Sequence, residues 1–339
     1  MNILITGCAG FIGFHLSNFL SKKYKNSKII GFDNLNNFYS PAFKKKRINQ
    51  LKKNKNFYFK KIDLENKKKV ENIFKKNKIK IVIHLAAQAG VRDSLKMPAS
   101  YFKSNFEGFI NIINNSNKNN LKKFIFASSS SVYGDKKKFP IKEDISILPK
   151  NIYSATKKIN EDIAKDLSRI SKMKIIGLRF FTVYGDYGRP DMFIFKFLSS
   201  LINNKKFYLY NKGNHFRDYT HIDDVVNIVF RLIKKKISKN FEIFNVCSNK
   251  PVDLNKLVKF ISKNLNIYPK IIKKSRNNIE VLKTHGDNKK ILSFLKIKLK
   301  KNIYFELPKI IDWYKKNKIW KFHNWIIYND KKKNLFQYL

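Results

Sequence analysis

Two short runs of the sequence carry side chains that could move a proton. The run "FASSSSVYG" covers residues 126–134, and "YSATK" covers residues 153–157. Tyr153 and Lys157 are four residues apart, so on a helix they share one face and the ammonium can stand beside the phenol. A phenol with a pKa of about 10 is a poor base at pH 7, but a neighbouring cation favours the phenolate. We therefore interpret Tyr153 as a candidate base and Lys157 as its supporting charge.

The four consecutive serines admit two interpretations. Ser129, at the end of an apolar run, is the best placed to hydrogen-bond a reacting hydroxyl and hold it toward Tyr153. The alternative is a polar turn, with Tyr153 merely packed and Lys157 solvated. Other motifs in the chain decide between these two interpretations.

A glycine-rich run, "TGCAGFIG", follows the first apolar segment and spaces Gly7, Gly10 and Gly13 as GxxGxxG. Glycine there permits a tight turn, close approach of backbone N–H groups to a pyrophosphate, and close packing of a helix on a strand. Asp33 ends the next apolar run, where a carboxylate accepts hydrogen bonds from an adenosine ribose and disfavours a 2′-phosphate. The pattern predicts NAD rather than NADP, and it favours the catalytic interpretation of Tyr153. Asp63 is placed to meet the adenine edge or, alternatively, to cap a helix.

Apolar runs alternate with amphipathic stretches along the first 180 residues. Strands are expected at residues 2–6, 28–33, 56–62, 80–85, 123–127, 174–180 and 242–246, and the clearest helices at residues 11–22, 98–114 and 153–171. This alternation is typical of an α/β protein with a parallel sheet covered on both faces. We expect a Rossmann-type doubly wound parallel sheet with a smaller C-terminal substrate-binding domain.

The expected domains share an interface, because no linker rich in Gly, Ser or Pro separates them. The NAD-binding domain is expected at residues 1–180, completed by residues 219–249. The substrate-binding region is expected at residues 181–218 and 250–317, and residues 318–339 are an extension. A cleft should lie between the two parts.

Charge is the most unusual feature of the composition. The 72 Lys and Arg residues outnumber the 24 Asp and Glu residues, for a net charge of +48. Only eight of the basic residues are Arg, and short Lys runs are scattered through the chain at residues 44–46, 67–69, 136–138, 234–236 and 331–333. We interpret the runs as solvated positions of a compositional bias, so a nucleic-acid partner is not expected. The field would still steer an anionic substrate.

Two cysteines, Cys8 and Cys247, lie in apolar runs, so no disulfide framework is expected. The sequence starts directly with an apolar strand-like run, and no uncharged apolar stretch approaches the roughly 18 residues of a spanning helix. We expect a cytoplasmic protein without membrane contact.

Several runs together resemble the extended short-chain dehydrogenase/reductases and, within them, the UDP-glucuronate 4-epimerases. The runs are "ILITGCAGFIGFHL", "DNLNNFYSP", "HLAAQAGVRDSL", "FASSSSVYG", "YSATKK", "LRFFTVYGDYGRPDM" and "RDYTHIDDVV", and the resemblance covers about residues 1–315. Two departures stand out. Asp186 and Tyr187 occupy positions where relatives usually carry Pro and Trp, and "NNIEVLKTHGD" matches the nucleotide-contact segment near Arg276 and Asp287 only loosely.

The resemblance implies roles for individual residues. The residues implied to hold NAD are Gly7, Gly10, Phe11, Ile12, Gly13, Asp33, Asn34, Asp63, Ala86, Tyr153 and Lys157, and the implied catalytic set is Ser129, Tyr153 and Lys157. On the substrate side it implies Ser130 and Ser131 against the sugar, Thr182 and Arg189 at its carboxylate, and Arg217 on the UDP phosphates. The alternative for Arg189 is a loop arginine bonded to backbone carbonyls, in which case Arg92 is the next candidate for the carboxylate. A UDP-sugar substrate and a homodimer are also implied, and no metal is expected.

The residue before "VYG" discriminates among the related reactions. Dehydratases and UDP-glucuronate decarboxylases of this family keep a carboxylate there, whereas this chain has Ser131, which cannot act as an acid or base near pH 7. The expected reaction is therefore C4 epimerisation through a 4-keto intermediate. The alternatives are a UDP-glucuronate decarboxylase, another UDP-hexose 4-epimerase, and a non-catalytic scaffold that binds a nucleotide or a nucleic acid.

Overall fold

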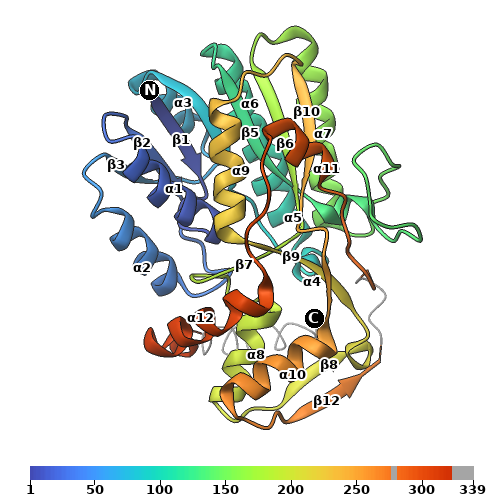
Figure 1. Cartoon of the computed structure of the whole chain (residues 1–339). Coiled ribbons are helices and arrows are strands. Elements are labelled where there is room, and N and C mark those ends of the chain that lie inside the picture. The colour runs from blue at the N-terminus through green and yellow to red at the C-terminus, as the bar shows by residue number, and fades with distance from the viewer. Residues whose placement is uncertain (276–280, 323–339) are drawn as a thin grey trace, which may run out of the picture.

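Seven parallel strands form the central sheet (Figure 1). In the computed structural model, which describes residues 1–275 and 281–322, the strand order is β10-β6-β5-β4-β1-β2-β3. The strands are β1 (Asn2–Thr6), β2 (Ile29–Asp33), β3 (Phe57–Lys61), β4 (Ile79–His84), β5 (Lys123–Ser129), β6 (Lys174–Phe180) and β10 (Phe241–Val246). Every neighbouring pair in this sheet is parallel. The predicted Rossmann-type sheet is confirmed, and each strand lies within about two residues of its expected limits.

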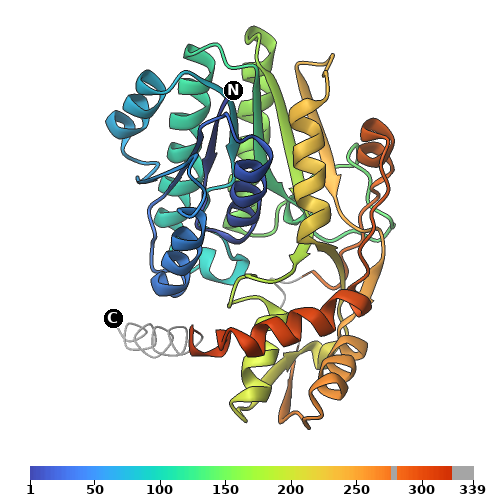
Figure 2. The same ribbon diagram turned by 60° about the vertical axis from the view of Figure 1, so that its left-hand side comes forward.

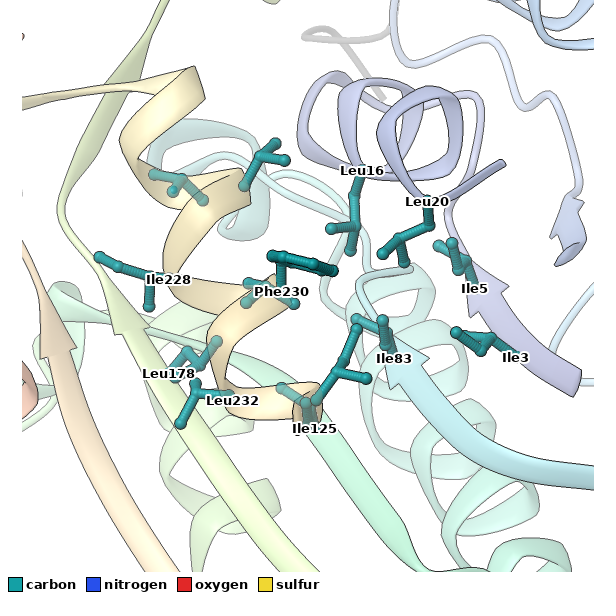
Figure 3. Close-up of a cluster of buried hydrophobic side chains, with 14 of the residues drawn as sticks. Ile3, Ile5, Leu16, Leu20, Ile83, Ile125, Leu178, Ile228, Phe230 and Leu232 are labelled. Atoms are coloured by element: carbon teal, nitrogen blue, oxygen red, sulfur yellow. The ribbon is translucent and has the colours of Figure 1, made fainter. Parts of the chain in front are cut away.

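Helices cover both faces of this sheet. One face packs against α1 (Phe11–Lys23), α2 (Pro41–Leu51), α9 (Ile222–Lys234) and α11 (Lys289–Leu295), and the other against α3 (Lys67–Lys76), α6 (Gly108–Lys118) and α7 (Ile152–Ile170). Side chains of a strand alternate between these layers, so Ile3 and Ile5 of β1 join the first core while Leu4 joins the second. Figure 3 shows side chains of the first core, among them Leu16 of α1, Phe230 of α9, and Ile5 and Ile83 of the strands. Burial on both faces explains the continuous apolar runs.

The helix expected at residues 98–114 is interrupted, and this expectation is corrected. The chain forms α5 (Pro98–Tyr101), a π-helical turn η1 (Phe102–Glu107) and then α6. Asn105 in the π turn is buried, accepts a hydrogen bond from the Gln88 N–H (2.7 Å) and donates to the Gln88 carbonyl (3.0 Å). A π turn alters the direction in which its side chains point relative to a regular α-helix, and here it accompanies the contact of Asn105 with Gln88. Helical periodicity could not reveal it, because the partner belongs to a distant loop.

The smaller part of the molecule lies at the carboxyl end of the large sheet (Figures 1 and 2). Its strands are β7 (Thr182–Tyr184), β8 (Phe207–Tyr210), β9 (Phe216–His221), β11 (Pro251–Asp253) and β12 (Ile271–Lys274), and its main helices are α8 (Phe193–Ile202), α10 (Leu254–Leu265) and α12 (Ile303–Lys316). Short elements complete the chain: α4 (Val91–Ser94), η2 (Ser130–Tyr133), η3 (Asn211–Gly213) and η4 (Ile319–Phe322). The residue limits of the two domains stay predictions. Of the extension at 318–339, residues 323–339 lie outside the described residues.

Arg47 of α2 joins the two parts of the molecule. Its fully buried guanidinium donates from Nη1 to the carbonyl of Ala9 (2.7 Å), in the glycine-rich loop. Nη2 donates to the carbonyls of Tyr187 (2.6 Å) and Gly188 (3.2 Å), which precede Arg189. One buried cation therefore holds the loop that follows β7 against the loop that follows β1.

We predict that Arg47→Met lowers the free energy of unfolding by about 2–4 kcal/mol, because three carbonyls lose a charged donor. Methionine retains much of the apolar contact of the stem. Urea denaturation monitored by circular dichroism measures the difference. Lys45→Met, at an exposed position of the same helix, is the matched control and should stay close to wild type. Equal stability of Arg47→Met and the control would show that these carbonyls find other donors.

Candidate active site

The glycine-rich loop between β1 and α1 has room for a bound group but not for side chains of its own. Gly7 has a φ of +72°, and a Cβ added there would lie 2.8 Å from the backbone nitrogen of Ala86, at the end of β4. A Cβ on Gly13 would lie 2.1 Å from the Gly7 carbonyl oxygen. The N-terminus of α1, at Gly10, has no side-chain cap. Its first N–H groups and the positive end of the helix dipole suit an anion such as a pyrophosphate.

Two carboxylates lie beyond this loop. Asp33, at the end of β2, accepts hydrogen bonds from the backbone N–H groups of Ala9 (3.2 Å) and Leu35 (2.8 Å), which fix its orientation. Asp63 accepts from the Asn34 amide (2.9 Å). Asp33 and Asn34 line the cleft, whereas Asp63 holds Asn34 from outside it. A carboxylate so fixed suits the hydroxyl groups of a ribose.

A cleft of about 260 Å³ runs along the carboxyl ends of the strands. We call it the cofactor cleft. The residues expected from the sequence that line it are Gly7, Gly10, Phe11, Ile12, Gly13, Asp33, Asn34, Ala86, Ser129, Tyr153, Lys157 and Arg189. The fold thus brings the glycine-rich loop and the candidate proton-transfer group into one cavity.

The end of β5 meets the start of α7 at this cleft. The Lys157 ammonium is buried and donates to the carbonyl of Ala127 (2.9 Å). The Ser129 hydroxyl accepts from the backbone N–H (3.2 Å) and the hydroxyl (2.9 Å) of Ser131. A hydrogen bond also joins Ser129 to the Tyr153 phenol. Ser129, Tyr153 and Lys157 therefore form one cluster.

Burial dominates the protonation of this cluster. It raises the pKa of Tyr153, while the hydrogen bond with Ser129 and the charge of Arg189 act in the opposite direction. Burial also lowers the pKa of Lys157 to about 8, and the charge of Glu161 opposes that change. The phenol is therefore neutral at pH 7, so its ionisation requires a further positive charge in the cleft, as a nicotinamide ring would bring.

A second cleft, of about 650 Å³, opens between the two parts of the molecule, and we call it the substrate cleft. Arg92, Thr182, Arg189 and Arg217 all line it. The Arg217 guanidinium donates from Nη1 to the carbonyls of Phe216 and Leu282, both at 3.0 Å. The Arg92 guanidinium lies 4.4 Å from the centroid of the Tyr210 ring. Three guanidinium groups make this cleft suitable for an anionic ligand.

Arg189 lies where the two clefts meet, since it lines both. Its Nε donates to one oxygen of Asp191 (3.0 Å) and its Nη2 donates to the other (2.5 Å). Burial disfavours the ionised carboxyl, but the guanidinium outweighs it and holds the pKa of Asp191 below its usual range. The alternative in which Arg189 is bonded to backbone carbonyls is wrong, because its partner is a carboxylate.

Other expected site residues lie elsewhere. Among the described residues that line the two clefts, neither Ser130 nor Ser131 occurs, and Ser131 instead supports Ser129 from the turn η2. Asp287 is buried and accepts from the Lys289 N–H (2.8 Å) at the start of α11. Arg276 lies outside the described residues.

Polar residues of the cofactor cleft that were not expected from the sequence include Asn36, Tyr39, Lys44 and Gln88. Lys44 belongs to a run interpreted as solvated, and that interpretation is wrong here. Its side chain is buried, donates to the Asn36 carbonyl (2.8 Å), and has a pKa lowered by burial to about 8. The signal was present, because Phe43, Lys44, Arg47 and Ile48 share one face of a helix.

Two further features of the described residues concern a metal-ion site and a membrane-spanning helix. Residues 1–275 and 281–322 contain no group of three or more His, Cys, Asp or Glu side chains suited to a metal ion. Within the same residues, no helix is both long and apolar enough to cross a membrane.

The glycine-rich loop, the fixed Asp33 carboxylate and the Tyr153 and Lys157 pair occur here on one doubly wound sheet. The chain belongs to the NAD dependent epimerase/dehydratase family, whose model matches residues 3–247. The cofactor of this family is NAD, and the uncapped helix terminus and Asp33 fit it.

The chain is also similar to individual proteins of this family. The chain is 37% identical to Protein CapI of Staphylococcus aureus, over 93% of this chain and 98% of the relative. It is 34% identical to a UDP-glucuronate 4-epimerase of Thermodesulfobacterium geofontis, over 93% and 96% of the two chains. It also resembles the crystal structure of UDP-glucuronic acid 4-epimerase from Bacillus cereus in complex with UDP-glucuronic acid and NAD. That match has a TM-score of 0.88 and 27% identity, and covers 93% of this chain and 99% of that one.

We predict that Gly13→Ala lowers the NAD content of the purified protein by about tenfold or more, because the new Cβ must displace the Gly7 carbonyl. Chromatography of the nucleotide released on denaturation measures this content. Lys22→Ala, at an exposed position of α1, is the control and should keep the wild-type content. An unchanged content in Gly13→Ala would show that the loop can open without losing the cofactor.

Proposed function

We propose that this protein is an NAD-dependent UDP-sugar 4-epimerase that interconverts UDP-glucuronate and UDP-galacturonate. The observation that carries the proposal is the place of Arg189, which lines both clefts and lies close enough to Tyr153 in the cofactor cleft for its charge to act on the phenol. A proton-transfer group and a carboxylate-binding group near each other suit the 4-hydroxyl of a uronic acid and the carboxylate on the adjacent ring carbon. The relatives named as UDP-glucuronate 4-epimerases support the same substrate.

The glycine-rich loop and Asp33 would hold NAD, which would supply a reversible hydride acceptor for C4 of the sugar. Tyr153 removes the proton of the 4-hydroxyl group as C4 is oxidised, and gives it back when C4 is reduced. Ser129 holds the reacting oxygen toward Tyr153, and its own orientation depends on Ser131. The protonated Lys157 stabilises the phenolate form of Tyr153.

Inversion requires the 4-keto sugar to show its other face before it is reduced. The substrate cleft, at about 650 Å³, has room for that rotation about the bond to the diphosphate. Arg217 and Arg92 are proposed to hold the diphosphate during the rotation, since guanidinium groups pair well with phosphate oxygens. The sugar can then turn while its nucleotide stays in place.

Ser131 argues against decarboxylation and dehydration. Those reactions use a carboxylate at this position in related enzymes, and a serine hydroxyl cannot act as an acid or base near pH 7. Here that hydroxyl donates to Ser129, which is a positioning role. A scaffold without catalysis would not require a buried ammonium group in the cleft that Tyr153 lines, because burial of a charge is costly. The second candidate function is a 4-epimerase that acts on a neutral UDP-hexose. Arg189 distinguishes the two functions, because a neutral sugar has no carboxylate for it to bind.

The first test is the reaction itself. Purified protein incubated with UDP-glucuronate should form UDP-galacturonate without added NAD and without loss of carbon dioxide, because hydride is returned to the same carbon. Nuclear magnetic resonance of the products measures both. UDP-xylose as the main product would overturn the proposal in favour of a decarboxylase.

Tyr153→Phe is the matched control for this reaction. It removes one oxygen atom and should keep the fold and the bound cofactor, yet lower kcat by about a thousandfold. Retention of more than about a tenth of the activity would assign proton transfer to another group.

A second test concerns substrate choice. Arg189→Gln should lower kcat/KM for UDP-glucuronate by about ten- to a hundredfold, because a charge-assisted pair with the sugar carboxylate is lost. UDP-glucose has no carboxylate and should lose far less. The measurement is the ratio of the two kcat/KM values in the variant and the wild type.

An equal decline for both sugars would mean that Arg189 acts only through its pair with Asp191. The carboxylate would then be read elsewhere, and Arg92→Gln becomes the variant to compare. A wild type that prefers UDP-glucose would favour the second candidate.

A further inference from the structure

A buried ion pair lies behind the proposed proton-transfer group. Glu161 belongs to α7 and Arg179 to β6, and their side chains are only 5% and 4% exposed. The guanidinium donates from Nε to one carboxylate oxygen (2.9 Å) and from Nη2 to the other (2.7 Å). Its Nη1 donates to the Tyr133 hydroxyl (2.9 Å) and to the Glu143 carbonyl (3.0 Å). Four hydrogen bonds from the Arg179 guanidinium therefore hold the pair in one orientation.

Glu161 also contacts the strand that carries Ser129. The Ser128 hydroxyl donates to the Glu161 carboxylate, and Ser128 is the register neighbour of Arg179 in the sheet. Lys157, one turn earlier on the helix, donates to the carbonyl of Ala127. Three side chains on successive turns of α7 thus hold three consecutive residues of β5, since Tyr153 meets Ser129.

Stability alone is a weak reason for this ion pair. Removing two charges from water is expensive, and well-packed apolar side chains often replace a buried pair without loss of stability. Hydrogen bonds to Ser128 and proximity to Lys157 are properties that apolar side chains could not supply. We propose that Glu161 is a positioning residue for the epimerisation: held by Arg179, it fixes the end of β5 and keeps Lys157 in its ammonium form. This inference rests on the proposed roles of Tyr153 and Lys157.

The groups that face Lys157 and Glu161 come from several elements. Those facing Lys157 are Glu161 of α7 and His84 of β4, and Tyr153 of α7 lines the same cleft. Those facing Glu161 are Arg179 of β6, Tyr133 of η2 and, beyond Arg179, Glu143 of the following loop. Burial, followed by the charge of Lys157, lowers the pKa of His84 to about 3, so this imidazole is neutral. Burial raises the pKa of Tyr133, so this phenol is neutral as well. Glu161 is thus the anion that acts directly on the Lys157 ammonium.

The direction of the effect follows from these charges. Burial lowers the pKa of Lys157 to about 8, and Glu161 opposes it. Without the negative charge of Glu161, the positive charge of Arg179 is no longer balanced and also disfavours the ammonium. Lys157 then loses its proton at a lower pH than in the wild type. Because the ammonium supports the phenolate of Tyr153, turnover should decline at the alkaline end.

The experiment compares the pH dependence of kcat and KM for Glu161→Gln and the wild-type holoenzyme with UDP-glucuronate. Glutamine keeps the shape and an acceptor for Arg179 and Ser128. The alkaline decline of kcat should begin at a lower pH, so that kcat at alkaline pH is lower by about tenfold, with KM little changed. Asp162→Asn removes the same charge at the next residue, which is exposed and pairs with Lys158, and should leave the profile unchanged.

A kcat lowered by the same factor at every pH, or an unchanged profile, would overturn the inference and leave Glu161 a structural residue. If Glu161→Gln does not fold, Ser128→Ala decides, since it keeps the ion pair and removes only the link to β5. Its kcat should fall several-fold at unchanged KM, and a wild-type kcat would overturn the inference. Failure of the proposed function differs from all of these, because the wild type itself would then turn over no UDP-sugar.

Discussion

Parallel pairing of the seven strands is the constraint on which this molecule depends. It makes every strand of the central sheet end at the same edge, so loops far apart in the chain meet there. The glycine-rich loop after β1, Asp33 at the end of β2, Ala86 after β4 and Ser129 at the end of β5 become neighbours for this reason. The chain leaves β1 and β4 in opposite directions across the sheet, which opens the crevice that the cofactor requires. The smaller part of the molecule covers this edge, so its arginines face the same space.

Burial of cations is the second theme, and the protein handles each one differently. Arg47 donates to backbone carbonyls and serves as a structural joint. Arg179 is neutralised by Glu161 through two hydrogen bonds. Lys157 donates to the Ala127 carbonyl, with Glu161 acting through space, and burial keeps its pKa lowered. Full pairing stabilises a charge permanently, whereas incomplete pairing leaves it able to respond to a neighbouring phenol.

The departures from the family pattern are accommodated by packing. Tyr187 adopts a φ of +52°, and its ring lies 4.6 Å from that of Phe14 and 4.7 Å from that of Trp313, measured between centroids. An aromatic ring is thus kept where relatives usually carry Trp, and it connects the loop before Arg189 to α12. The carbonyl of Asp186 lies 2.9 Å from Nε2 of His15 in α1. The loop that carries Arg189 is therefore held from three helices, which keeps this guanidinium at the junction of the clefts.

The sequence by itself determined where most strands and helices lie along the chain, because this depends on local periodicity. It also indicated the glycine-rich loop, Asp33, and the Ser129, Tyr153 and Lys157 set, because these depend on short spacing. It could not reveal the π turn at Asn105 or the carboxylate partner of Arg189. Each of those depends on which distant segment packs against the residue, and spacing in the chain does not specify that. Only the tertiary structure decided that Glu161 and Arg179 lie directly behind Lys157. The physical reason is that a charge can be buried only where another part of the fold supplies its partner.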